Sequence, residues 1–162
     1  MNVELRAPVR EDFELLSRLR NDRVIQRQLM IEPKIYSARQ VQAWIRRRTR
    51  DSGGEFFVID YLGPCGFAQL TRIDRKRGSA DLGICLIAAV RGKGVAANAL
   101  QRLVSHAKRE LGCKRVTLQV LRINHRAIAL YRKMKFKVRQ TKHQFYFDGA
   151  HWRDVVFMEK QL

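Results

Sequence analysis

Cysteine is scarce in this chain. The three cysteines, Cys65, Cys85 and Cys113, are widely spaced, which excludes both a paired disulfide framework and a CxxC metal site. Free cysteine behaves as a small apolar residue, and it is more often buried than catalytic. We therefore expect three reduced, structural thiols and no bound metal.

Long apolar runs are also missing. The longest, Leu82 to Val90, is too short to cross a bilayer. The opening segment, MNVELRAPVRED, carries acids where a secretory signal needs an apolar stretch. We therefore expect a cytoplasmic protein with no membrane partner.

Acidic residues are few, with 15 against 33 basic residues and a net charge of +18. None occurs between Glu110 and Asp148, a stretch rich in lysine and arginine. The positive electrostatic potential of such a stretch attracts anions, so the partner could be nucleic acid, a phosphorylated cofactor, a nucleotide-linked substrate or an acidic protein surface. The alternative is a set of solvated helix faces, so charge alone names no partner.

The length and composition predict one domain. A chain of 162 residues with 46% hydrophobic residues can build a single core, so we assign residues 1–162 to one domain. Three closely linked strand patterns predict an antiparallel meander, and the following strand, helix and strand predict a right-handed crossover between parallel neighbours. The expected strands cover residues 3–9, 55–62, 65–73, 79–87, 115–121, 141–147 and 151–158, and the expected helices cover residues 11–20, 37–50, 92–112 and 124–135.

A glycine-containing loop opens the strongest predicted helix. Gly92 and Gly94 flank Lys93 directly after an apolar strand, where free amide hydrogens and the positive end of the helix dipole suit a diphosphate. Glycine also punctuates ordinary strand-to-helix turns, so the isolated loop is equally compatible with a structural role.

The wider context favours the functional interpretation. The segment LGICLIAAVRGKGVAANAL resembles motif A of the GNAT acetyltransferase superfamily, and VLRINHRAIALYRKMKF is similar to a later motif of that family. The resemblance implies an α/β (α+β) GNAT fold: a mixed, mostly antiparallel sheet with a central parallel strand–helix–strand unit, flanked by helices. It also implies an acetyl-CoA-dependent N-acetyltransferase that needs no metal.

The resemblance assigns residues to the acetyl donor. The strand end lends backbone groups to the pantetheine arm, the loop holds the diphosphate, and an asparagine supplies a later contact. Carried over in that order, these residues are Cys85, Leu86, Ile87 and Ala88; Arg91, Gly92, Lys93, Gly94, Val95 and Ala96; and Asn124. Two positions depart from the family pattern, Ala88 for a common proline and Lys135 for a common glycine, and the second raises the question of a positive φ before Phe136.

Two residues are candidates for proton transfer. The resemblance places Tyr131 at the thioester sulfur, and a phenol with a pKa near about 10 can protonate a thiolate whose pKa is near about 8.5. Spacing alone would make Tyr131 a core aromatic. Asp81 is the candidate general base, with a solvent-facing strand aspartate as the alternative. His143 and His151 are weaker candidates, and His106 and His125 are expected to be exposed on helices.

The acceptor side is predicted from the segment LRNDRVIQRQLM. It resembles a segment of two GNAT branches, which act on nucleotide-linked amino sugars, as in the pseudaminic acid pathway, and on ribosomal-protein N-termini. The resemblance makes Arg20, Asn21, Arg27 and Met30 candidate substrate residues, against ordinary helix termination. Because a basic face suits a nucleotide diphosphate, we favour the amino sugar as the small-molecule acceptor. The oligomeric state is open, with a homodimer as one form.

A second class of function is a non-enzymatic nucleic-acid-binding domain. Its surface would be the acid-free stretch from Leu111 to Phe147, where Tyr131, Phe136, Phe145 and Tyr146 are interleaved with basic residues. Such a domain would bind polynucleotide in a salt-sensitive way and would not respond to CoA.

Overall fold

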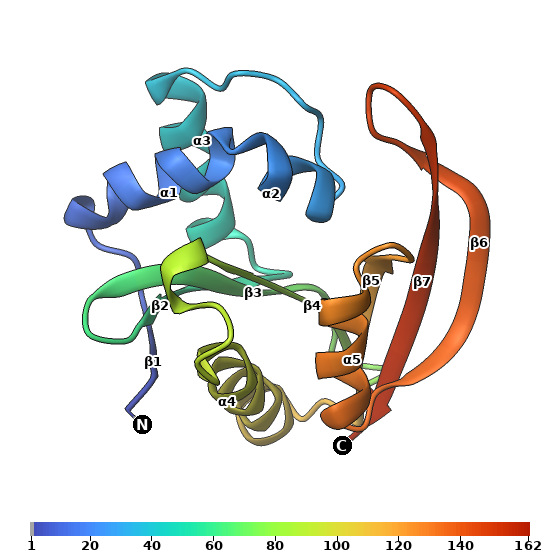
Figure 1. Cartoon of the computed structure of the whole chain (residues 1–162). Helices are drawn as coiled ribbons and strands as arrows, with labels where there is room; N and C mark the ends of the chain where they lie inside the picture. Colours follow the sequence, from blue (N-terminus) through green and yellow to red (C-terminus); the bar gives the residue numbers. More distant parts are fainter. Residues whose placement is uncertain (1) are drawn as a thin grey trace.

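A seven-stranded sheet forms the centre of the computed structural model, which describes residues 2–162 (Figure 1). The strand order is β1-β2-β3-β4-β5-β7-β6, and only the β4–β5 pair is parallel. This arrangement confirms the predicted mixed, mostly antiparallel sheet. The strands are β1 (Glu4–Arg6), β2 (Glu55–Asp60), β3 (Pro64–Asp74), β4 (Ser79–Leu86), β5 (Arg115–Leu121), β6 (Lys137–Phe147) and β7 (Trp152–Gln161).

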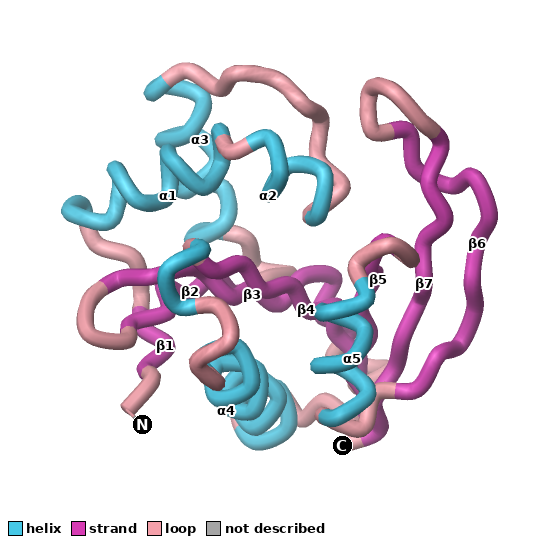
Figure 2. The backbone as a smooth tube through the Cα atoms, in the orientation of Figure 1, coloured by secondary structure: helices cyan, strands magenta, loops and turns pink. Residues whose placement is uncertain are grey.

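Helices cover both faces of this sheet (Figure 2). One face carries α4 (Val95–Arg109) and α5 (His125–Lys133). The opposite face carries α1 (Phe13–Asn21), α2 (Arg23–Gln28) and α3 (Ala38–Arg50). Within residues 2–162, no helix has the length and apolar character needed to span a bilayer.

Helix α4 packs on the sheet through an apolar stripe. Val95, Ala99, Leu100, Leu103 and Ala107 are each fully buried, at spacings that place them on one side of a helix. They join the larger core cluster, which also takes side chains from β3, β4, β5, β7 and α5. This packing fixes the start of α4 beside the end of β4.

A second, smaller core joins α1 and α3 to the other face. Trp44 of α3 is its centre, with ring centroids 5.4 Å from Phe56 and 5.6 Å from Phe67 in edge-to-face geometry. A capping box opens α3, because the Ser37 side chain accepts from the Gln40 amide and the Gln40 side chain accepts from the Ser37 amide.

The sequence did not predict α2. Asp22 caps this short helix by accepting from the amides of Val24, at 2.8 Å, and Ile25, at 3.0 Å. The helix that was predicted to end at Arg20 ends at Asn21, and only Asp22 separates it from α2. Helix α2 and the residues after it, up to Met30, contribute to the lining of the cleft described below.

Other predicted boundaries also need correction. The first strand covers only Glu4–Arg6, and α4 begins at Val95 because the preceding Gly92 and Gly94 adopt positive φ. The final hairpin is longer than predicted, since β6 begins at Lys137 and β7 continues to Gln161.

The β6–β7 hairpin reaches back towards the N-terminal helices (Figure 1). Near its tip, the Tyr146 hydroxyl donates to the carbonyl of Ile31 at 3.0 Å, in the loop after α2. Residues far apart in the chain are thereby joined along one side of the molecule.

The end of α5 answers the question raised by Lys135. This residue has a φ of 67°, so lysine adopts the left-handed conformation that glycine favours. The Phe136 amide donates to the Tyr131 carbonyl and the Lys135 amide donates to the Arg132 carbonyl, both at 2.9 Å. This is the Schellman pattern, and the rings of Tyr131 and Phe136 supply its apolar contact, with centroids 5.8 Å apart. The C-terminal turn of α5 therefore helps to hold the ring of Tyr131.

We predict that Lys135→Gly stabilises the fold by about 0.5–1 kcal/mol, since glycine removes the strain of a positive φ at a modest entropic cost. Urea unfolding measures this change. Arg132→Gly is the matched control, because it places glycine in helical backbone three residues earlier and should lower stability by about the same amount. A loss of stability in Lys135→Gly would contradict the assignment of this turn.

Candidate active site

A cleft opens where β4 and β5 part. The two parallel strands pair only from Ser79 to Asp81 on β4 and from Arg115 to Thr117 on β5. Beyond that point β4 continues to pair with β3, and β5 with β7, but not with each other. The resulting cleft has a volume of about 720 Å³ and is lined by both strands and by residues from α1 to α5. This size is typical of a site for a small molecule or cofactor.

One end of the cleft is the start of α4. Gly92 and Gly94 have φ values of 84° and 82°, and Gly94 caps the helix without any side-chain hydrogen bond. By contrast, α2, α3 and α5 begin with the side chains of Asp22, Ser37 and Asn124. The first amides of α4 thus receive no side-chain cap from the residue that precedes the helix, which suits an anion such as the diphosphate of CoA.

Basic side chains surround this loop, with differing roles. Arg91 folds back and donates to the Leu86 carbonyl at 3.0 and 2.8 Å, so it fixes the loop against the end of β4. Arg126 of α5 lies so close to Gly92 that an added Cβ would be 3.0 Å from its guanidinium. The sequence analysis did not single out Arg126 or Lys133, because only the fold brings α5 to the loop.

Tyr131 belongs to α5, on the face of the sheet that also carries α4. Its side chain is 8% exposed and lines the cleft, and burial raises the pKa of its phenol to about 12. Within residues 2–162 its hydroxyl makes no hydrogen bond. The phenol is therefore protonated throughout the neutral and mildly alkaline range and is free to donate to a bound group.

Asp81 lies at the vertex of the cleft, in the last residue pair that joins β4 to β5. One carboxylate oxygen accepts from the Thr117 hydroxyl and the other pairs with the Arg72 guanidinium. A carboxylate has further lone pairs, so these contacts orient Asp81 while leaving acceptor capacity.

The structure brings most of the predicted residues to the cleft. Its lining includes these eleven: Arg20, Met30, Asp81, Cys85, Leu86, Arg91, Gly92, Gly94, Ala96, Asn124 and Tyr131. Asn124 also caps α5, accepting from the Ala127 amide at 3.2 Å.

The other predicted residues do not line it: Ile87, Ala88, Lys93, Val95, Asn21 and Arg27. Val95 is fully buried in the core, and Lys93 and Arg27 are exposed. Asn21 has a structural role, because its side chain accepts from the Tyr36 amide at 2.7 Å and donates to the Tyr36 carbonyl at 3.1 Å.

The histidines lie outside the cleft. His143 pairs with Asp154, and His151 is exposed in the last turn. His125 is exposed as expected, but His106 is only partly exposed, because it contacts Glu55 and packs its ring on Phe57. None of them is placed to assist Asp81.

The cysteines are buried, as their sequence context predicts. Burial raises the pKa of the Cys85 thiol to about 12, so it stays protonated at neutral pH. No cluster of His, Cys, Asp or Glu side chains in residues 2–162 has the arrangement of a metal site.

Several residues that line the acceptor side of the cleft were not predicted from the sequence. Trp44, Arg48, Gln69, Thr71 and Arg72 come from α3 and β3. Arg48 belongs to a run of arginines on α3, and such a run is typical of a solvated helix face. Two signals could have found some of them: the alternation of β3, which points Gln69 and Thr71 away from the buried Ala68 and Leu70, and the position of Arg48 four residues after Trp44 on α3.

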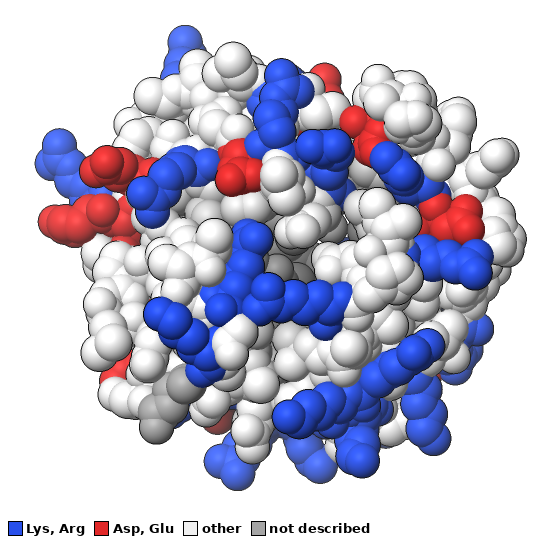
Figure 3. All heavy atoms as spheres, in the orientation of Figure 1, with Lys and Arg blue, Asp and Glu red and all other residues white. Residues whose placement is uncertain are grey.

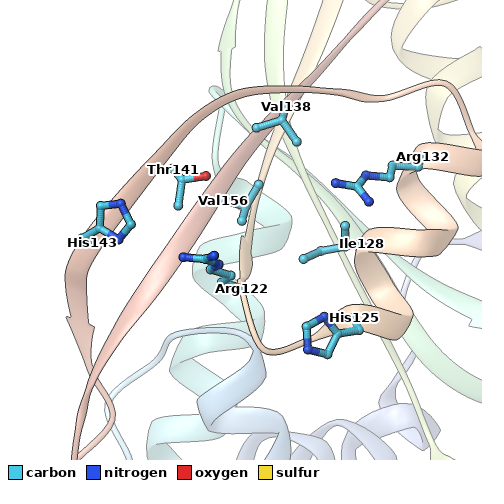
Figure 4. Close-up of a pocket in the computed structure, with 8 residues that line it drawn as sticks. All are labelled: Arg122, His125, Ile128, Arg132, Val138, Thr141, His143 and Val156. Atoms are coloured by element: carbon cyan, nitrogen blue, oxygen red, sulfur yellow. The ribbon is translucent and has the colours of Figure 1, made fainter.

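A second cavity, of about 590 Å³, lies between α5 and the β6–β7 hairpin (Figure 4). Arg122, His125, Arg132 and His143 provide its polar lining. The carboxylate of Asp154 contacts two of these side chains: that of Arg122 at 3.2 Å and that of His143 at 3.0 Å. Two of the basic side chains of this cavity therefore already have a carboxylate partner within the protein.

Comparison with known proteins decides the family. The model of the acetyltransferase (GNAT) domain matches residues 2–137, which is most of the chain. The chain belongs to the GNAT acetyltransferase family. This GNAT protein is an N-acetyltransferase with acetyl-CoA as its acetyl donor, so the interpretation as a non-enzymatic nucleic-acid-binding domain was wrong.

The relatives refine the picture of this GNAT enzyme. It is 27% identical over 160 residues to the spermidine N(1)-acetyltransferase of Escherichia coli K12, covering 97% of this chain and 84% of the relative. The structure of spermidine N-acetyltransferase from Vibrio cholerae in complex with CoA and spermine has a TM-score of 0.91 at 24% identity, covering 98% of this chain and 95% of that chain. A dodecameric structure of the V. cholerae enzyme has a TM-score of 0.83 at 23% identity, covering 98% and 93%. At these identities the structural likeness shows the GNAT fold, and the relatives point away from the amino-sugar and ribosomal-protein branches.

We predict that Gly94→Ala weakens the binding of CoA about tenfold, because a Cβ at this positive φ shifts the first amides of α4. Isothermal titration calorimetry measures the dissociation constant. Gly112→Ala is the matched control: it has a φ of 64°, lies beyond the other end of α4 and has no atom within 4 Å of an added Cβ. Equal effects of the two variants on CoA binding would contradict the role of the loop.

Proposed function

We propose that this GNAT enzyme acetylates a primary amine of a small molecule, which meets the thioester of acetyl-CoA inside the cleft between β4 and β5. One observation carries the proposal: a single cleft contains the free amides of α4, the Tyr131 phenol and the Asp81 carboxylate, and continues to the helices on the other face. Donor and acceptor can thus approach one another from opposite faces of the sheet.

The donor end can hold acetyl-CoA with groups already described. The first turn of α4 and the loop from Arg91 to Gly94 would bind the diphosphate, with Arg126 beside them. The edge of β4 beyond Asp81 offers unpaired backbone groups to the pantetheine arm. Acetyl-CoA supplies the acetyl group, and after the transfer CoA leaves as a free thiol.

In our proposal Tyr131 provides the proton for that thiol. Because its pKa is raised to about 12, the phenol is protonated at every pH at which the enzyme would work. Its ring is held by Phe136, so its hydroxyl can be directed into the cleft without loss of side-chain order.

Asp81 is our candidate for the general base. The acceptor must reach the thioester as a neutral amine, and an ammonium group can lose its proton to a carboxylate directly or through a water molecule. Thr117 and Arg72 fix the orientation of Asp81 at the vertex, where both faces of the sheet meet.

The acceptor is the open part of the proposal. The E. coli relative is named for spermidine, so a polyamine is the first acceptor to test. The earlier preference for a nucleotide-linked amino sugar, and its ribosomal-protein alternative, gain no support from these relatives.

Assembly into a homo-oligomer belongs to the same proposal, since one structure of the V. cholerae relative is described as dodecameric. Val138, Phe145, Phe147 and Trp152 of the β6–β7 hairpin are each 45% or more exposed and provide an apolar surface. We expect sedimentation to give a mass above the 19.0 kDa of one chain, and Trp152→Asp to lower it. A monomeric wild-type protein at micromolar concentration would overturn this part.

We predict that Tyr131→Phe lowers kcat by about 100-fold or more and leaves the KM for acetyl-CoA unchanged, because only proton donation is lost. Steady-state assays of thiol release measure both quantities. Because the phenol makes no internal hydrogen bond, unfolding stability should be unchanged. Tyr61→Phe, outside the cleft, is the control, and a Tyr131→Phe enzyme with full turnover from pH 6 to 10 would remove Tyr131 from the mechanism.

A further inference from the structure

The acceptor side of the cleft is unusually cationic. Among residues 2–162, six basic side chains line the cleft, against a single carboxylate, that of Asp81. Arg126, Arg91 and Lys133 lie at the donor end, but Arg20 of α1 and Arg48 of α3 lie on the other face of the sheet. In the view of Figure 3, blue side chains border a hollow near the centre of the molecule.

Arg20 and Arg48 have no anionic partner in residues 2–162. The Nε atom of each is buried and makes no hydrogen bond. Neither guanidinium forms an ion pair, and the one carboxylate nearby in the lining is already held by Arg72 and Thr117. A buried, unpaired N–H group is costly, so structures rarely keep one that has no ligand or water to meet it.

Aromatic rings hold Arg20 in place. Its guanidinium carbon lies 4.5 Å from the centroid of the Tyr36 ring and 4.9 Å from that of Trp44. Stacking of this kind orients a guanidinium, while its N–H groups point outward in the plane of the guanidinium, where an acceptor can meet them. A guanidinium held in this way is suited to bind an anion.

The surroundings also place like charges together. The pKa of Arg20 is lowered, first by burial and then by repulsion from Arg48 and Arg47, with Tyr36 acting in the opposite direction. An anion between Arg20 and Arg48 would remove this repulsion. The cavity beside α5 differs in this respect, because its Arg122 and His143 already pair with the carboxylate of Asp154.

The phosphates of CoA do not account for these two arginines. The free amides of α4 lie on the face covered by α4 and α5, whereas Arg20 and Arg48 stand on the helices of the opposite face, above the second core (Figure 1). Residues Trp44, Phe67 and Gln69 share that face with them. A ligand reaching Arg20 and Arg48 is therefore the acceptor.

We propose that the acceptor is a primary amine that carries a phosphate or carboxylate group, and that Arg20 and Arg48 bind this anion while the amine faces Asp81. The proposal rests on the acetyltransferase function proposed above and specifies its substrate. The same guanidinium groups repel a polyamine, which carries several positive charges at neutral pH and would find one carboxylate, already paired.

Matched pairs of amines test the proposal. Glucosamine 6-phosphate is compared with glucosamine, 4-aminobutyrate with butylamine, and spermidine is measured beside them, with acetyl-CoA saturating in every assay. We expect kcat/KM for at least one anionic member to exceed both its neutral partner and spermidine by about tenfold or more. The two pairs distinguish a phosphate from a carboxylate as the recognised group.

Variants then locate the effect. Arg48→Gln should raise the KM for the preferred anionic amine about tenfold or more while leaving its neutral partner and the KM for acetyl-CoA unchanged. Arg47→Gln is the matched control, because Arg47 is the adjacent residue of α3, is exposed and does not line the cleft. Arg20→Lys, which keeps the charge but loses the fixed fork, should give a smaller rise in the same KM.

The outcomes separate this proposal from the function on which it rests. Preference for spermidine or for a neutral amine, or an Arg48→Gln enzyme with unchanged KM for the anionic amine, would overturn the anionic acceptor and leave acetyl transfer standing. CoA binding without turnover of any amine in the panel would count against both.

Discussion

The parting of β4 from β5 is the constraint on which the site depends. A parallel pair normally continues its ladder, yet here the pairing ends at Asp81 and Thr117 while each strand stays bonded to its outer neighbour. The sheet therefore keeps its stability through β3 and β7 and still leaves two inner edges unpaired. Those edges are not solvent-exposed strand ends but the walls of a cleft.

This gap joins two faces with different tasks. On one face, α4 begins without a side-chain cap, and the residues of its first turn line the cleft. On the other, α1 and α3 are held by the Trp44 core and carry Arg20 and Arg48. Tyr131 and Asp81 lie where the faces communicate. The excess of positive charge in the chain thus serves two separate anion sites in our account, one for the donor and one for the acceptor.

How much could be predicted depended on how local each signal is. The glycine loop is set by neighbouring residues and was found at its predicted place, and the helices predicted over residues 37–50 and 92–112 are present as α3 and α4 with shifted ends. The departure at Lys135 was also visible, although only the structure shows that lysine accepts the positive φ within a Schellman turn.

The residues that escaped prediction are those brought together by long-range packing. Arg126 reaches Gly92 because α5 docks beside α4, and Arg48 reaches the cleft because α3 packs through Trp44. The only local signal that separates Arg48 from the exposed Arg47 is helical spacing, which places Arg48 four residues after Trp44 and seven after Val41, on the buried face of α3. Likewise, α2 depends on a single capping aspartate, which also reads as the end of a helix.

The central claim is that the unpaired inner edge of β4 and the uncapped start of α4 together receive the acetyl donor. Amide hydrogen exchange resolved by residue, measured with and without CoA, tests it most directly. Our account predicts new protection between residues 82 and 86 and at residues 92–97, with the paired segment 79–81 unchanged. Saturating CoA that leaves exchange in both segments unaltered would contradict it.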